Sequence, residues 1–281
     1  MFKKEYHCLV AGLPDLFFNE NKTNTDSTNF SQQLKTELAV SDFELVKLIY
    51  LASDNENLLN LLLDHKKPFN HTGNFTEQYL QQQLAPQDSP TELPDYMLQF
   101  LQWMKQTERK ALTLDAEIIL QQFYYEYILQ TKNDFLRNWF VFQLNLKNIL
   151  TAINCIRFDY NLEDQLIKTN ENRNVWSLLI SKKLKPELFE DEVPYYKEIF
   201  KVTETDLNWI EKEKAIDKLK WDYLDENTFF YYFTIEKILS FVIKLNIMER
   251  WMKLDKKTGE ELLNKLVNEF KTTYEFPLEF S

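Results

Sequence analysis

The clearest pattern in the chain is a stripe of apolar residues between positions 135 and 156. Successive members are four, three, four, three, four and three positions apart, which is the spacing of one face of an α-helix. They are Phe135, Trp139, Phe142, Leu146, Ile149, Ile153 and Ile156, with Asn138, Asn145 and Asn148 on other faces. The stripe is either a coiled-coil seam or a core-facing surface. A single unbroken helix of this length in a globular chain favours the core-facing surface.

Further helical patterns lie on both sides of this stripe. Ser41 and Glu44 have the spacing of a capping box, which predicts a helix start at this point, and residues 58–63 predict a second, short helix. Pro94 stands where the first turn of another helix tolerates proline. A helix is also expected from Asp115 to about Gln130. The residues expected to face inward on it are Ile118, Ile119, Phe123, Tyr127 and Ile128.

The most apolar segment, residues 228–253, is predicted to be a central helix that is covered on most of its sides. One face carries Tyr231, Ile235, Ile238, Val242, Leu245 and Met252, and a narrow polar strip carries Lys237, Ser240 and Lys244. Residues 255–259 are predicted to form a turn, and residues 261–270 a final short helix. The aromatic tail at 274–280 is expected to dock onto the body or onto a partner.

Two segments have less regular patterns. The apolar run at 6–13 fits either a buried strand or one tight helix, and its length does not decide between them. Residues 66–94 contain Pro68, Pro86, Pro90 and Pro94. Because proline removes a hydrogen-bond donor and restricts its predecessor, this segment is predicted to be an irregular connection and the candidate hinge. We otherwise expect residues 1–281 to form a single all-helical domain.

Composition supports an all-α fold class. The chain has only 3 glycines, at positions 12, 73 and 259, whereas sheet proteins need glycine for many tight turns. The 22 Phe, 14 Tyr and 6 Trp residues predict a core built from bulky rings. The two features together favour a multi-helix bundle.

Charge and apolar runs narrow the classes of partner. The chain has 33 Lys and Arg against 44 Asp and Glu, a net charge of −11, which opposes non-specific binding to nucleic acid. The sequence shows no run that could span a membrane, and the apolar stretch at 8–13 is too short for a signal-peptide core. Cys8 and Cys155 form no metal or redox motif. We therefore expect a cytoplasmic protein.

The motifs of common catalytic and cofactor sites are absent from the sequence. Its three scattered glycines exclude a P-loop and a dinucleotide-binding fingerprint. None of His7, His65 and His71 follows a glutamate by three positions, which excludes the Glu-x-x-His motif of di-metal bundles. We therefore predict a protein without catalytic, cofactor-binding or metal-binding residues, and not an enzyme. Glu236 is the one candidate for acid–base chemistry. The favoured interpretation is that its carboxylate is satisfied by a partner on a neighbouring helix and has no catalytic role.

Two aromatic runs, residues 123–125 and 229–233, have the composition of base-stacking platforms. Such platforms need a basic groove around them. The flanking residues here are Glu126, Asp225 and Glu226. Core packing or contact with another protein is therefore the better interpretation of both runs.

Three segments resemble proteins of archaeal/vacuolar-type rotary ATPases. Residues 139–153, which include Asn-Leu-Lys-Asn-Ile-Leu at 145–150, resemble a helix of the ATPase C subunit, called subunit d in the vacuolar enzyme. Residues 236–259, with Glu-Arg-Trp at 249–251, are similar to a later helix of that family. The opening Leu-Val-Ala-Gly-Leu-Pro-Asp at 9–15 resembles the start of an uncharacterised bacterial family associated with such ATPases.

This resemblance implies an elongated or funnel-like helical bundle that couples the membrane rotor ring to the central stalk. Such a protein would be a non-catalytic subunit or accessory adaptor, without a cofactor, and peripheral at the inner face of the membrane through the ATPase complex. Its partners would be central-stalk and rotor-ring subunits. Two alternatives remain: a helical scaffold or regulatory protein of another assembly, and an enzyme with an unfamiliar carboxylate site at Glu236.

Overall fold

The structure is a computed structural model that describes residues 4–20, 23, 25–63, 67–85, 91–106, 112–181 and 184–273, with the backbone alone at 112–115 and 256–273. The described residues form eleven α-helices and one 3-10 helix, and they contain no strand. The predicted all-α fold class is confirmed. The opening run, which the sequence left open, is the short helix α1 (His7–Ala11).

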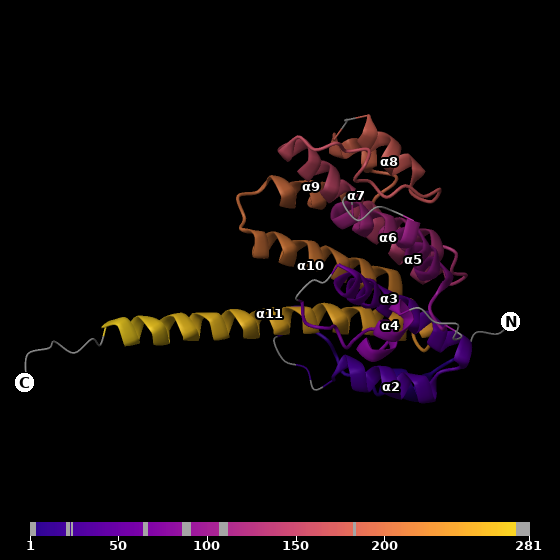
Figure 1. The fold of residues 1–281 in the computed structure, drawn as a ribbon. Coiled ribbons are helices and arrows are strands. Elements are labelled where there is room, and N and C mark those ends of the chain that lie inside the picture. Colours follow the sequence, from indigo (N-terminus) through magenta and orange to yellow (C-terminus); the bar gives the residue numbers. More distant parts are fainter. Residues whose placement is uncertain are drawn as a thin grey trace, which may run out of the picture.

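The helices pack in two groups on either side of α10 (Trp209–Thr228) (Figure 1). One group holds α5 (Asp95–Gln106), α6 (Leu112–Ile128), α7 (Asp134–Phe158), α8 (Arg173–Ile180) and α9 (Tyr196–Glu204), with the 3-10 helix at Pro186–Phe189 between the last two. The other holds α2 (Ser27–Glu37), α3 (Val40–Leu62), α4 (Glu77–Leu84) and α11 (Ile235–Thr273).

Helix α7 confirms the core-facing interpretation of the apolar stripe. It begins after Asn133, whose side chain accepts a hydrogen bond from the backbone N–H of Leu136, and it ends at Asp159 in the left-handed conformation. Five stripe residues are buried: Phe135, Trp139, Phe142, Leu146 and Ile149. Ile156, at the end of the stripe, is 50% exposed because the last turn of α7 extends past the core.

Helix α3 corrects two predictions. It starts at Val40, after an extended Ala39 with no side-chain cap, so the capping box predicted for Ser41 and Glu44 is wrong. It also runs unbroken to Leu62, so residues 58–63 are not a separate helix. Polar residues in its middle do not end the helix, because their side chains bond to the segment 70–75. Examples are Asn57, which pairs with the backbone of Asn70, and Asp54, which accepts from the N–H of Phe75.

Helix α6 lies close to its predicted position in the sequence, but the face that it buries differs from the predicted face. Its buried residues are Ala116, Leu120, Tyr124, Tyr125 and Ile128. The other residues predicted to face inward, Ile118, Ile119, Phe123 and Tyr127, are only half-buried. The buried residues Ala116, Leu120, Tyr124 and Ile128 are spaced four positions apart. The predicted residues Ile119, Phe123 and Tyr127 each precede one of them by one position.

Helix α11 is the central helix that the apolar pattern predicted, but the predicted start at residue 228 is wrong. Thr228 ends α10, residues 229–234 form a turn that includes Tyr231, and α11 begins at Ile235. It packs against α2, α3, α7 and α10, and Ile235, Ile238, Val242 and Leu245 are buried along it. The predicted turn at 255–259 is wrong, because α11 continues through it to Thr273 and includes the predicted final helix. A single interior glycine costs a helix only about 1 kcal/mol, which Gly259 shows is not enough to end it.

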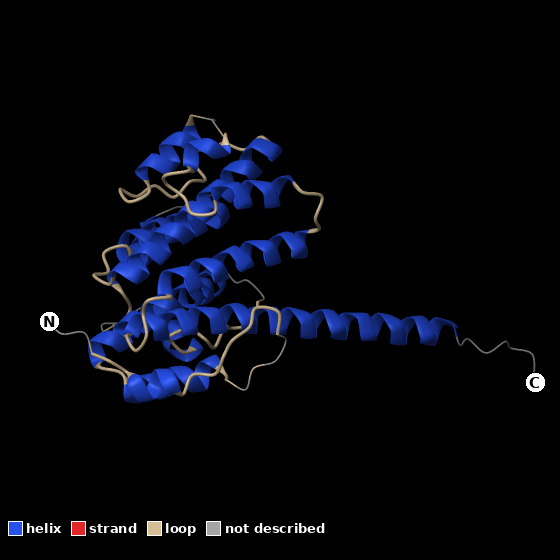
Figure 2. Cartoon of the chain, turned by 180° about the vertical axis from the view of Figure 1, so that it is seen from behind, coloured by secondary structure: helices blue, strands red, loops and turns tan. Residues whose placement is uncertain are grey.

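The second half of α11 extends away from the rest of the molecule, as Figure 1 and the reverse view in Figure 2 both show. The aromatic tail at 274–280 lies outside the described residues. The expected irregular segment at 66–94 contains α4, and the hinge proposed for it stays a prediction. The single-domain prediction for residues 1–281 likewise stays a prediction.

Candidate functional site

The turn between α10 and α11 carries four exposed aromatic side chains close together in the sequence. Phe229, Phe230 and Tyr232 are 68%, 81% and 65% exposed, and Phe233 is 38% exposed. We call these four residues the aromatic turn. It is the second of the two aromatic runs in the sequence, and its exposure favours contact with another protein over core packing.

Hydrogen bonds at both ends fix the backbone of the aromatic turn. The hydroxyl of Thr228 donates to the carbonyl of Leu224 at 2.6 Å, which closes the last turn of α10. The carbonyl of Phe233 accepts from the N–H of Tyr6 at 2.7 Å. The ring of His7 lies 4.4 Å from the ring of Phe233, centroid to centroid. The rings are therefore presented from a held backbone.

Glu236, the candidate acid–base residue, lies just inside the first turn of α11 and is 2% exposed. One carboxylate oxygen accepts from the side-chain amide of Asn133 at 3.2 Å, and the other accepts from the hydroxyl of Thr234. Arg250 lies near Asp217 rather than near Glu236. This arrangement fits the favoured interpretation, a carboxylate that is bonded by its neighbours.

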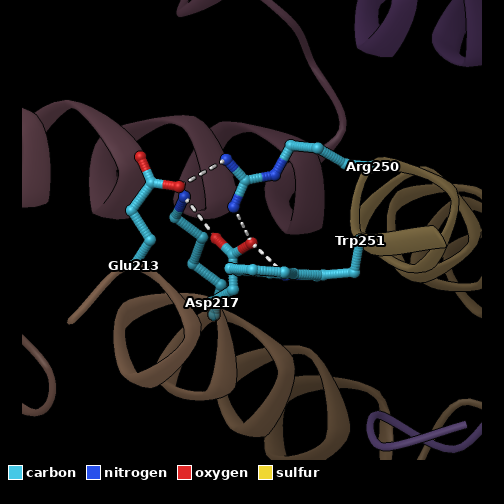
Figure 3. A network of polar contacts seen from close by, with 5 residues as sticks. Glu213, Asp217, Arg250 and Trp251 are labelled. Atoms are coloured by element: carbon cyan, nitrogen blue, oxygen red, sulfur yellow. Dashed lines mark hydrogen bonds and ion pairs between the residues drawn. The ribbon is translucent and has the colours of Figure 1, made fainter. Parts of the chain in front are cut away.

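A second buried carboxylate, Asp217, holds α10 and α11 together where α11 leaves the body (Figure 3). It is 2% exposed. It forms an ion pair with Arg250, accepts from the indole N–H of Trp251 at 3.0 Å and pairs with Lys220 at 3.0 Å. Arg250 also approaches Glu213 at 3.6 Å. We call this group the Asp217 network.

Sequence reasoning did not identify the Asp217 network. Its members come from two helices, and Asp217 and Trp251 are 34 positions apart. Asp217 stands in a strongly charged helix, so no local pattern separates it from its solvated neighbours. The one available signal was the Arg-Trp pair at 250–251 on an apolar helix, since a buried indole N–H usually has a hydrogen-bond acceptor.

Asp54 on α3 is a third buried carboxylate, and the sequence did not indicate it either. It accepts from the side-chain amide of Asn74 at 2.6 Å and from the N–H of Phe75 at 3.1 Å. Burial raises the pKa of this carboxyl from 3.8 to about 6, and these hydrogen bonds only partly oppose the rise. A Cβ atom on Gly73 would lie 2.3 Å from one carboxylate oxygen, so the neighbouring backbone approaches Asp54 at a position where only glycine fits.

The histidines and cysteines are not brought together. His7 and His71 are exposed and lie in different parts of the fold, and His65 is outside the described residues. Cys8 is exposed and Cys155 is buried, and both are free. Within the described ranges, no group of three or more His, Cys, Asp or Glu residues could hold a metal ion. Nor does any described helix have the length and apolar character needed to cross a membrane.

Comparison with known proteins gives one positive finding. No curated protein and no solved structure shows a significant match to the chain. A family model does match residues 3–274, which is nearly the whole sequence. The chain therefore belongs to the DUF2764 family, which is described as a protein of unknown function.

Proposed function

We propose that this protein is a non-catalytic adaptor that holds other protein subunits together, and that these are central-stalk and rotor-ring subunits of an archaeal/vacuolar-type rotary ATPase. The observation that carries the adaptor role is the aromatic turn, with four exposed rings on five consecutive residues. Cores of protein interfaces are enriched in aromatic residues, and such residues supply much of the binding energy.

The aromatic turn is suited to binding because its backbone is already fixed. The hydrogen bonds of Thr228 and Phe233 hold it on both sides. A surface that is ordered before binding loses less conformational entropy when a partner arrives. Phe and Tyr have only two side-chain torsions, so the cost of fixing each ring is also small.

Helix α11 supports the idea that the protein joins two partners. At a rise of about 1.5 Å per residue, its 39 residues span about 60 Å. It begins beside the aromatic turn and ends on the opposite side of the molecule, beyond the other helices (Figure 1). A partner on the aromatic turn and a partner on the distal part of α11 would therefore not compete for space.

The more specific part of the proposal, the rotary ATPase, is supported by the resemblance of residues 9–15, 139–153 and 236–259 to proteins of such enzymes. Two of these segments form the framework of the fold: residues 139–153 lie in α7, and residues 236–259 lie in α11. The resemblance therefore involves the helices that would transmit force through the adaptor.

The test is affinity purification of the tagged full-length protein from cells that express it, followed by mass spectrometry. We expect stalk and rotor-ring subunits to be recovered with the wild type, and their yield to fall about tenfold or more with the double variant Phe230→Ala/Tyr232→Ala. Phe17→Ala is the matched control, because Phe17 is 56% exposed but lies outside the turn.

Each outcome decides a different part of the proposal. Recovery of other partners, lost in the double variant, would support an adaptor of another assembly and overturn the ATPase assignment. Equal recovery with the wild type and the double variant would overturn the role of the aromatic turn. An ATPase complex that purifies intact and coupled without this chain would also contradict its role as a stalk component.

A further inference from the structure

A cavity of about 380 Å³ lies between α3 and α6, at some distance in the sequence from the aromatic turn. Leu59 and Leu63 line one wall, and Leu120 and the rings of Tyr124 and Tyr125 line the other. The walls of this cavity are more apolar than polar, and its volume is within the range of small-molecule sites. The proposed adaptor role makes no use of it.

Lys147 of α7 is the feature that distinguishes this cavity. Lys147 is among the residues that line the cavity, and its amino group donates a hydrogen bond to the side-chain oxygen of Gln121, which is neutral. Among the described residues it has no carboxylate partner within ion-pair distance, although Glu117 lies near enough to interact electrostatically. Burial lowers the pKa of Lys147, and Glu117 opposes this only in part, so a larger fraction of the amine is free than in an exposed lysine.

Lys244 offers an internal comparison. Burial lowers its pKa as well. Its amino group, however, is paired with Asp225 and stands 4.9 Å from the ring centre of Trp221, and it is not among the residues that line this cavity. Of these two lysines with a lowered pKa, only Lys147 combines a neutral partner with an open, apolar space.

The charges around the cavity indicate the class of ligand. Glu56 and Glu117 line it together with Lys67 and Lys147, so the formal charges cancel. No net positive field would draw an anion into it. An apolar, uncharged molecule with one group that reacts with an amine fits these walls better than a carboxylate or a phosphate.

The geometry points to Lys147 as a nucleophilic amine that binds small apolar aldehydes or ketones as an imine. The amine nitrogen attacks the carbonyl carbon and a C–N bond forms. The carbonyl oxygen then leaves as water with the two amine hydrogens, and the C=N double bond remains. No oxidant or reductant takes part, and the reaction is reversible. Desolvated lysines in apolar pockets are the usual amines of this chemistry.

The test is to incubate the full-length protein with cinnamaldehyde and sodium cyanoborohydride, which reduces any imine to a stable amine, and to locate the label by peptide mass spectrometry. We expect Lys147 to be labelled about tenfold faster than Lys244 or an exposed lysine such as Lys214, since the cavity holds the aldehyde against the amine. Lys147→Arg should abolish this fast phase.

A second variant separates the cavity from the reactivity of the lysine alone. Leu59→Phe fills part of the cavity and leaves Lys147 in place, and it should slow the labelling of Lys147 without changing that of Lys214. Circular dichroism would show that both variants keep the helical fold. Labelling of Lys147 at the rate of the exposed lysines, or labelling that Leu59→Phe does not change, would overturn the inference. The adaptor proposal would be unaffected by either result.

Discussion

The two aromatic runs of this chain have similar residues and opposite surroundings. In the run at 123–125, Tyr124 and Tyr125 are buried in α6, and the ring of Tyr124 lies 5.8 Å from that of Tyr96. In the aromatic turn, Phe230 is 81% exposed. The difference lies in the element that carries them. A helix surrounded by α3, α5 and α7 offers covered faces, whereas a connection between two antiparallel helices offers few.

The comparison shows that the composition of a run does not set its role. Both runs have acidic flanks and no basic groove, and sequence reasoning gave them the same two interpretations. The surrounding helices cover the two tyrosines of the first run and leave most of the second run exposed. Three measurements test this contrast.

The largest expected effect is on the buried run. Tyr124→Ala would remove a ring that packs against Tyr96 and Tyr125, and would lower the free energy of unfolding by about 3–5 kcal/mol. Urea unfolding followed by circular dichroism measures this loss. A loss below about 1 kcal/mol, as for a surface residue, would show that the ring is not packed as described.

The second effect concerns the buried carboxyl next to this run, since Asp54 acts electrostatically on both Tyr96 and Tyr124. The pKa of Asp54 is about 6 in the fold and about 3.8 when exposed. Between these values the folded state binds more protons than the unfolded state, so stability should fall as the pH rises from about 4 to about 6, by up to about 3 kcal/mol.

Urea unfolding at a series of pH values would measure this decrease. Asp54→Asn should flatten the profile in this range, because the amide does not titrate. Asp134→Asn, at an exposed position on α7, should leave the decrease in place. A profile that rises through this range in the wild type and is unchanged by Asp54→Asn would contradict the burial of the carboxyl.

The smallest expected effect on stability is at the aromatic turn. Phe230→Ala and Tyr232→Ala should each change the free energy of unfolding by less than about 0.5 kcal/mol, because the rings are largely exposed in the isolated protein. The same urea assay checks this. A loss of about 2 kcal/mol or more would mean that the rings pack within the chain, and the two runs would no longer differ.

The sequence predicted the helices more reliably than their ends. The spacing from Phe135 to Ile149 was sufficient for α7, because an apolar stripe is a local property of one helix. The predicted break at 255–259 failed, because glycine and charged residues weaken a helix without ending it. The start of α3 was misplaced because Ser41 and Glu44 follow the capping pattern, whereas the chain enters the helix at Val40.

The candidate sites were harder to predict, because each depends on contacts between distant elements. Asp217 and Trp251 meet only when α10 and α11 pack together. Asp54 becomes buried only when the segment 70–75 crosses α3, and the cavity beside Lys147 exists only between α3, α6 and α7. Glu236 was singled out because it lies within an apolar run, which is a local signal, and its neighbour Asn133 lies 103 positions away.

The Asp217 network stands at the place where α11 leaves the protein. Trp251 is the last buried residue described on this helix, and Lys253 and Leu254 are already exposed. A load on the distal part of α11 would therefore reach the body near Trp251, where the Asp217 network joins this helix to α10. The buried part of α11 lies on the other side of this network and begins beside the aromatic turn. Because α11 is one continuous helix, a displacement of its distal part would be transmitted along it toward Ile235, next to the aromatic turn.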